Sequence, residues 1–220
     1  MYGIVNKGVR DMIIQNYGHA TWQEIKNEAG CEDDFFMSMY AYEDEITYNL
    51  VGAASKILDT PAHDILVAFG EYWINFTADE GYGELLQLAG NTFPEFLSNL
   101  DNLHQRVGST YKHLNPPSFL CKEINEHTLL LEYHSSREGL SSLVLGLIKG
   151  LGKKFNVSVE VKQIKNREEV GYDEFFVNYF PIEKEQSGSP NSEKKTTKNA
   201  KGRCPFSTLG GIQENISTDR

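Results

Sequence analysis

The 220-residue sequence predicts an α+β domain, in which a run of helices precedes an antiparallel sheet of about four strands with one inserted helix. Two observations predict this fold class. Apolar residues recur every three or four positions up to about residue 111, and after that point they alternate with a period of two. The apolar share of 40%, with 11% aromatic residues, is that of an ordinary globular domain with a sizeable core.

The first half of the chain is predicted to be helical. The segment 1–17 places Ile4, Val5, Met12 and Ile13 near one face. Further helices are expected at residues 21–30, 46–60, 62–77, 81–90 and 93–111. Glycines and prolines separate most of these segments, as they do at the ends of helices.

The period changes after Pro116 and Pro117, a rigid turn that stops the preceding helix. Strands are expected at residues 118–124, 128–135, 156–165 and 173–180. The first two strands are joined by a turn at residues 125–127. A helix at 139–155 is inserted between the second and third strands, with an apolar face made of Leu140, Leu143, Val144, Leu147 and Leu151.

The composition predicts a domain over residues 1–181 and a flexible polar tail or linker over residues 182–220, which is rich in Ser, Lys, Asn, Gly and Thr. Residues 1–180 carry 14 positive and 26 negative side chains, a balance of −12. Such a surface repels phosphate backbones, which argues against a nucleic-acid partner.

No segment has the roughly 18 consecutive apolar residues of a membrane-spanning helix, and the N-terminus does not look like a signal peptide. We therefore expect no membrane insertion and a cytoplasmic protein. The three cysteines, Cys31, Cys121 and Cys204, are far apart, and no CxxC or CxxCH motif is present. This spacing predicts neither a disulfide framework nor a covalently attached heme.

Among the six histidines, His104 differs because it shares a predicted helix face with Leu97, Leu100 and Val107, so it faces the core. A single histidine in such a place is more often a structural core residue than a ligand. As a metal ligand it would need one imidazole nitrogen directed into an apolar cavity and the other N–H held by a hydrogen bond.

Tyr133, Ser135 and Arg137 form a second pattern. A strand would place the three on one face, with successive side chains about 6–7 Å apart. Two hydroxyl groups and a guanidinium in a row suit an anion such as a carboxylate. Taken alone, such a pattern is more often a polar strand end that faces solvent.

The combination of these features resembles one family. Tyr133-x-Ser135-x-Arg137 in LEYHSSREGL, His104 in NLDNLHQRVG and Pro117 thirteen residues later are similar to the signature positions of the H-NOX family, the heme nitric oxide/oxygen-binding domains. The stretches MYGIVNK, LVGAASKIL, AFGEYW and VLGLIKGLGK look like the same family. The resemblance covers residues 1–180. It is greatest to stand-alone cyanobacterial members, and it extends to the heme domain of the soluble guanylate cyclase β subunit.

The resemblance implies a non-covalent heme b buried between the helical part and the sheet. His104 would be the axial ligand of the heme iron, and Tyr133, Ser135 and Arg137 would bind the heme propionates. Pro117 would press against the macrocycle and distort it, which is one way in which a protein alters heme electronics.

The resemblance also implies a choice of gas. Oxygen-binding members carry a distal tyrosine where this sequence has Leu143, which offers no hydrogen-bond donor. Val5 and Trp73 are expected to line the same distal pocket, and the Trp73 indole N–H is a donor that would weaken the argument if it faced the gas. We expect ferrous heme that binds NO and CO and discriminates against O2.

In the implied mechanism, NO weakens the bond between iron and His104 and thereby signals to a separate partner, such as a histidine kinase or a cyclic-nucleotide enzyme. No catalytic activity is expected of this chain. Three alternatives stay open: an O2-binding or redox heme sensor, a heme enzyme such as an oxygenase or peroxidase, and a module that binds another carboxylate or a fatty acid.

Overall fold

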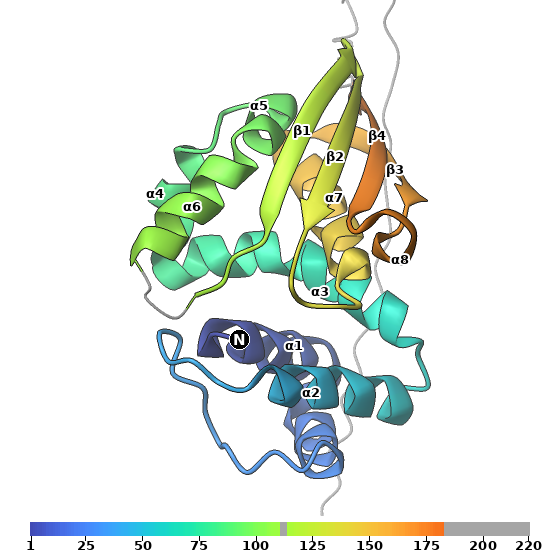
Figure 1. The fold of residues 1–220 in the computed structure, drawn as a ribbon. Coiled ribbons are helices and arrows are strands. Elements are labelled where there is room, and N and C mark those ends of the chain that lie inside the picture. The colour runs from blue at the N-terminus through green and yellow to red at the C-terminus, as the bar shows by residue number, and fades with distance from the viewer. Residues whose placement is uncertain (111–113, 183–220) are drawn as a thin grey trace, which may run out of the picture. The chain divides into compact units, whose positions relative to one another are not determined.

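A helical first half and a four-stranded sheet make up the computed structural model, which describes residues 1–110 and 114–182 (Figure 1). The helices are α1 (Gly3–Glu28), α2 (Asp44–Ile57), α3 (Ala62–Thr77), the π-helical turn η1 (Ala78–Tyr82), α4 (Gly83–Gln87), α5 (Phe93–Ser98), α6 (Leu100–Thr110), α7 (Ser141–Phe155) and α8 (Arg167–Val170). The strands are β1 (Ser118–Asn125), β2 (Thr128–His134), β3 (Val157–Lys165) and β4 (Asp173–Pro181). Beyond Ile182, the tail that the sequence predicts lies outside the described residues.

The four strands form one antiparallel sheet in the order β1-β2-β4-β3, and α7 lies between β2 and β3 in the chain. The predicted α+β class and the inserted helix are therefore confirmed. Leu131 on β2 pairs with Cys121 on β1 and with Phe175 on β4. Leu131 and Phe175 are fully buried, which places the inner face of the sheet in the core.

The core consists of two clusters. The first lies among α1, α2 and α3 and includes Val9, Ile13, Trp22, Leu50 and Phe69. The second lies between the sheet and the helices α5 and α7 and includes Phe93, Phe96, Leu129, Ile148 and Val177. Figure 1 shows α3 running between the sheet on one side and α1 and α2 on the other.

Helices α3 and α7 approach each other closely at Gly70. A Cβ atom at that position would lie 2.3 Å from the Leu143 carbonyl oxygen, a distance that the backbones cannot accept. Glycine therefore allows the contact that brings Trp73 on α3 and Leu143 on α7 to the same region.

Two helix boundaries differ from the prediction. The segments 1–17 and 21–30 belong to one element, α1, with a kink at Gly18, where φ is 87°. The predicted helix 93–111 is interrupted at Asn99, whose side-chain Nδ2 donates to the Ala89 carbonyl oxygen at 3.0 Å. This bond ties Asn99, the residue directly after α5, to the loop that follows α4. The turn η1 and the short helix α8 are not foreseen by the periodicity.

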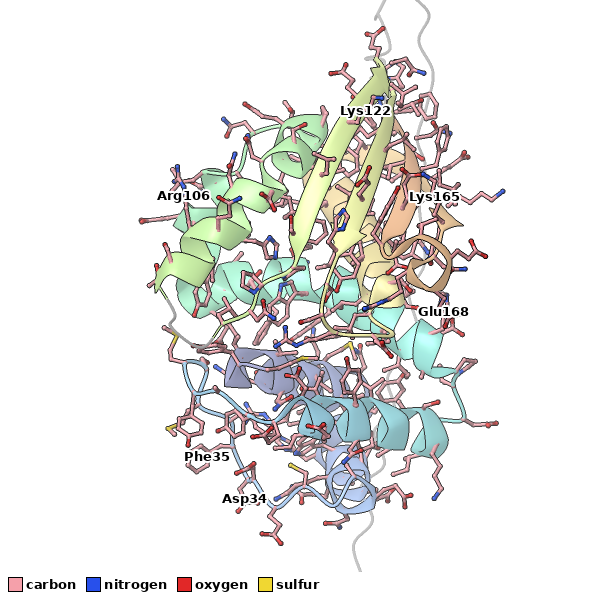
Figure 2. The ribbon with its side chains drawn as sticks, in the orientation of Figure 1. Asp34, Phe35, Arg106, Lys122, Lys165 and Glu168 are labelled. Atoms are coloured by element: carbon pink, nitrogen blue, oxygen red, sulfur yellow. The ribbon has the colours of Figure 1, made fainter. Side chains whose placement is uncertain are left out.

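Charged side chains project outward around the domain, among them Lys122 and Glu168 (Figure 2). Phe35, in the loop between α1 and α2, is also on the surface and is 67% exposed. Within the described ranges, no helix has both the length and the apolar character needed to cross a membrane.

Candidate functional site

A cavity of about 310 Å³ lies where α1, α3, α6 and α7 meet the inner face of the sheet. This volume is within the range of about 300–1,000 Å³ that is usual for sites that bind small molecules and cofactors. Aliphatic and aromatic side chains make up most of its wall: Ile4, Val5, Trp73, Ile74, Leu85, Leu86, Phe96, Leu97, Leu100, Leu103, Val107, Phe119, Leu131, Leu140, Leu143, Val144, Leu147, Ile148 and Leu151.

All the side chains that the sequence singled out line this one cavity. They come from six different parts of the fold and are Val5 on α1, Trp73 on α3, His104 on α6, Pro117 before β1, Tyr133, Ser135 and Arg137 at the end of β2 and beyond it, and Leu143 on α7. The structure therefore brings the predicted residues together, and their individual roles remain predictions.

His104 has the hydrogen bond that a ligand histidine needs. Its Nδ1 lies 2.8 Å from the Leu100 carbonyl oxygen, one helical turn earlier. Because a carbonyl oxygen can only accept, Nδ1 carries the hydrogen and Nε2 keeps its lone pair. Burial lowers the pKa of the imidazole, against the opposing effects of the Leu100 carbonyl and the Asp101 carboxylate, and so favours the neutral form that can bind a metal.

The sequence predicted that Tyr133, Ser135 and Arg137 lie along one strand. In the structure only Tyr133 belongs to the strand, because β2 ends at His134. The chain turns after that residue, where the Ser135 hydroxyl oxygen accepts the Arg137 backbone N–H at 3.0 Å. The phenol of Tyr133 is only 5% exposed, and burial raises its pKa, while a hydrogen bond with Ser135 acts in the opposite direction. The turn still leaves all three side chains at the cavity.

The Arg137 guanidinium is held from two sides. Its Nε donates to Oδ2 of Asp44 at 2.8 Å, and its Nη1 donates to the Asn115 carbonyl oxygen at 2.8 Å. The side chain is 18% exposed, so these bonds are largely shielded from water. The sequence analysis missed Asp44, which is 93 residues away from Arg137, and no local pattern could have found it.

The wall formed by Val5, Trp73 and Leu143 is mainly apolar. The Trp73 ring packs against Phe69 and Phe76, with ring centroids 5.6 and 5.7 Å apart. Its indole N–H forms no hydrogen bond with another described residue, so a donor is available on this side. Leu143 offers none.

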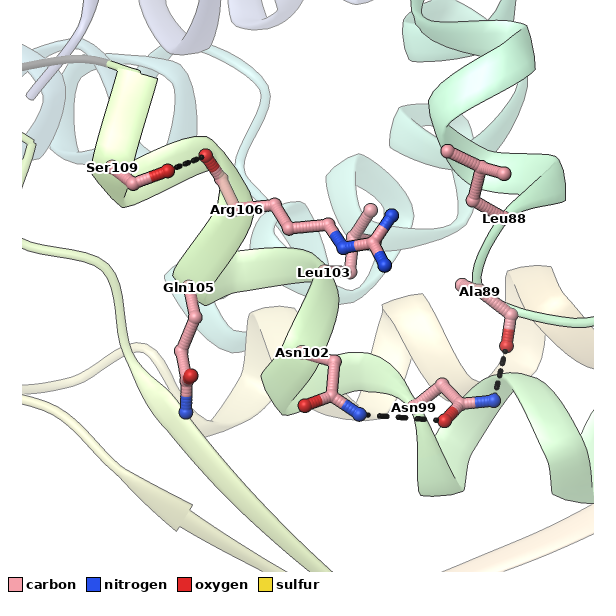
Figure 3. A pocket seen from close by; sticks show the side chains of 8 residues that line it. All are labelled: Leu88, Ala89, Asn99, Asn102, Leu103, Gln105, Arg106 and Ser109. Atoms are coloured by element: carbon pink, nitrogen blue, oxygen red, sulfur yellow. Dashed lines mark hydrogen bonds between the residues drawn. The ribbon is translucent and has the colours of Figure 1, made fainter.

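A second cavity, of about 480 Å³, opens on the outer side of α6 (Figure 3). Polar side chains dominate its lining, and none of the predicted site residues belongs to it: Leu88, Ala89, Asn99, Asn102, Leu103, Gln105, Arg106 and Ser109. This cavity lacks the apolar walls that a flat hydrophobic cofactor needs.

The first cavity fits a heme better than it fits a bare metal ion. In the described part of the chain, no three His, Cys, Asp or Glu side chains are grouped so that they could hold an ion. Heme supplies four nitrogen ligands itself and needs one axial group from the protein, which the neutral His104 can provide. Its two carboxylates would find hydroxyl and guanidinium donors where Tyr133, Ser135 and Arg137 meet the cavity.

Comparison with known proteins agrees with this geometry. A family model described as HNOB, Haem-NO-binding, matches residues 2–163. The chain therefore belongs to this family, the H-NOX domains, which confirms the resemblance noted in the sequence.

Among curated relatives, the soluble guanylate cyclases gcy-32 and gcy-31 of Caenorhabditis elegans are 34% and 30% identical over 70% and 76% of this chain. The chain spans about a quarter of their length, 23% and 24% respectively. The cyclase activity in their names belongs to those whole proteins.

Solved structures show the same fold. The unliganded Fe(II) H-NOX protein from K. algicida superposes with a TM-score of 0.72 at 24% identity, covering 84% of this chain and all of the other. The Fe(II)NO H-NOX protein from S. oneidensis gives 0.74 at 19% identity, covering 82% and 99%. At these identities the likeness establishes the fold alone.

Proposed function

We propose that this chain is a heme-based gas sensor that binds NO and CO at a ferrous heme b and discriminates against O2. The single observation that carries the proposal is the state of His104. Burial favours the neutral imidazole, whose Nδ1 hydrogen-bonds to the Leu100 carbonyl oxygen and whose Nε2 has no hydrogen-bond partner among the described residues at this apolar cavity. The three polar residues near the end of β2 supply the matching site for two carboxylates.

In this proposal each residue of the cavity has one task. His104 holds the iron from α6, while Tyr133, Ser135 and Arg137 bind the propionates and fix the orientation of the ring. Pro117 is half-buried at the cavity wall. Because its pyrrolidine ring is rigid, Pro117 resists the heme macrocycle where the two press against each other. When bound, heme supplies a ferrous iron that can take a diatomic gas as its sixth ligand.

The proposed choice of gas follows from the wall opposite His104. Bound O2 carries partial negative charge and needs a hydrogen-bond donor much more than NO or CO does. Leu143 and Val5 provide no donor, so the site favours the two less demanding gases.

The proposed output begins at His104. His104 would hold the heme iron from α6, and if NO weakened that bond, His104 would no longer anchor α6, which could then shift relative to β1. Two arrangements whose balance depends on a ligand are what a switch requires. We assign the reading of this shift to a separate partner, such as a histidine kinase or a cyclic-nucleotide enzyme, in the cytoplasm. We propose no catalysis by this chain.

One observation favours a different gas. The Trp73 indole N–H, which has no hydrogen-bond partner in the part of the chain that the structure describes, could donate to bound O2, and in that case the protein would be an O2 sensor. The heme-binding part of the proposal would be unaffected.

Titration with hemin tests the proposal. We expect the purified protein to bind about one equivalent and to develop a Soret band. His104→Ala should lose the spectrum of an imidazole-ligated ferrous heme, whereas His134→Ala should keep it. The control residue is also a histidine, but it packs on Tyr172 outside the cavity. A protein without a Soret band would exclude heme sensing and favour another carboxylate ligand, such as a fatty acid.

A further inference from the structure

The anion-binding guanidinium of Arg137 is oriented by residues that lie far from it in sequence. Asp44 is the first residue of α2, and its Oδ2 accepts from Nε at 2.8 Å. Asn115 precedes Pro116, and its carbonyl oxygen accepts from Nη1 at 2.8 Å. One edge of the planar group is thus fixed by α2 and another by the segment that leads to β1.

Helix α2 makes a second contact at the same place. Tyr48, one turn after Asp44, donates from its hydroxyl to the Glu138 carbonyl oxygen at 2.9 Å. The first two turns of α2 therefore hold both the side chain of Arg137 and the backbone that follows it. The other carboxylate oxygen of Asp44, Oδ1, pairs with the Met1 α-ammonium, which fixes the carboxylate in turn.

These bonds leave a defined part of the guanidinium available. Arginine has five N–H groups, and Asp44 and Asn115 take one each, from Nε and from Nη1. Three N–H groups remain, one on Nη1 and two on Nη2, and no other described residue takes those of Nη2, which leaves them for a ligand in the cavity that Arg137 lines. A long side chain that is held in one rotamer beforehand loses less conformational entropy when it binds a carboxylate.

We infer that Asp44 is a positioning residue for carboxylate binding by Arg137. Its hydrogen bond to Nε orients the guanidinium toward the cavity, and α2 is thereby part of the heme site although it contributes no predicted ligand. This inference rests on the proposed function, because heme propionates are the carboxylates concerned. A competing view is that Asp44 only offsets the charge of Arg137, in which case its removal would strengthen propionate binding.

The rate at which heme passes from the protein to excess apomyoglobin separates the two views. Asp44→Ala removes the acceptor, and we expect heme loss about fivefold faster, the size expected for one partly exposed charged hydrogen bond. Asp44→Asn keeps an oxygen that can accept from Nε, so its rate should stay within about twofold of the unmutated protein. Glu45→Ala is the matched control, because Glu45 is an exposed carboxylate in the same turn of α2.

A measurement without heme shows whether the guanidinium is positioned. In the apoprotein, the Nε–H signal of Arg137, assigned by its absence in Arg137→Lys, should be protected from hydrogen exchange. It should remain protected in Asp44→Asn and lose protection in Asp44→Ala. Tyr48→Phe, which removes one hydroxyl from a side chain that is about three-fifths buried, gives a milder test and should speed heme loss by about twofold to threefold.

Unchanged or slower heme loss in Asp44→Ala would overturn the inference, and so would equal acceleration in Asp44→Ala and Asp44→Asn. These outcomes differ from failure of the proposed function, which would appear as absence of heme binding in the unmutated protein.

Discussion

The Nδ1 nitrogen of His104 donates a hydrogen bond to the carbonyl oxygen of Leu100, 2.8 Å away in the first turn of α6. This bond settles which imidazole nitrogen is free, and it ties the direction of the ring to the helix that carries it. A movement of His104 toward or away from a ligand at Nε2 is therefore a movement of α6.

Exchange of His104 for glycine should separate heme binding from signalling. We expect His104→Gly to lose heme during gel filtration and to retain it when millimolar imidazole fills the space left by the side chain. Because the imidazole is not attached to α6, NO should no longer change the structure of this variant. Hydrogen exchange of α6 amides with and without NO provides the measurement. An NO-dependent change that persists in His104→Gly would contradict the mechanism.

Loss of the Arg137 guanidinium should weaken heme binding more than loss of the Ser135 hydroxyl. Charged hydrogen bonds contribute about 1.5–3 kcal/mol and neutral ones about 1 kcal/mol, so we expect heme loss roughly tenfold to a hundredfold faster in Arg137→Ala and about fivefold faster in Ser135→Ala. Arg106→Ala is the control, because that arginine projects from the outer side of α6 (Figure 2). Equal rates in Arg137→Ala and Arg106→Ala would show that Arg137 does not bind the cofactor.

A hydroxyl group placed at residue 143 should change the choice of gas. Leu143 lies on α7 and lines the cavity, and Leu143→Tyr introduces a donor there. We expect a reduced protein that forms an oxygen complex in air, while Leu143→Phe, of similar size and without a donor, does not. Trp73→Phe removes the other donor on this wall. An oxygen complex in the unmutated protein that disappears in Trp73→Phe would assign the protein to O2 sensing.

Acid should weaken the contact between α6 and β1. Asp101 accepts the Phe119 backbone N–H at 3.0 Å, and this bond, against the effect of burial, lowers the pKa of the carboxyl. A depressed pKa in the folded state adds stability above the unfolded value, about 3.9 for aspartate, and the contribution disappears as the pH falls through the folded value. We expect Asp101→Asn to lower the free energy of unfolding of the apoprotein by about 1 kcal/mol at pH 6.

Urea unfolding at several pH values measures this difference. The gap between the unmutated protein and Asp101→Asn should shrink as the pH falls from 5 to 3. A gap that is constant over this range would mean that the Asp101 charge does not contribute.

The class of fold and the residues of the cavity could be predicted from the sequence, and the connections among them could not. Helical and strand periods are local, so they indicated the α+β order, the inserted helix α7 and the inward face of His104. The end of β2 at His134 was missed because the polar residues Tyr133, Ser135 and Arg137 keep the spacing of two that is typical of a strand, although the strand itself has already ended. The helix break at Asn99 depends on a carbonyl ten residues earlier.

Asp44 illustrates the larger limit. Its bond to Arg137 joins the start of α2 to the turn after β2, and only the packing of the helical part against the sheet brings them together. The role of the Leu100 carbonyl could not be predicted either, because every residue has a backbone carbonyl and the sequence does not show which one accepts a hydrogen bond from a side chain. Hydrogen-bond partners that orient a site residue in this way are fixed by the folded structure and not by local sequence.

The absorption spectrum of the dithionite-reduced protein under argon, air, CO and NO tests the central claim most directly. We predict a Soret band under argon that is unchanged in air, shifts under CO, and under NO changes to that of a heme without a histidine ligand. A spectrum without a Soret band after hemin addition would contradict heme binding at His104. A stable oxygen complex in air would contradict the proposed preference for NO.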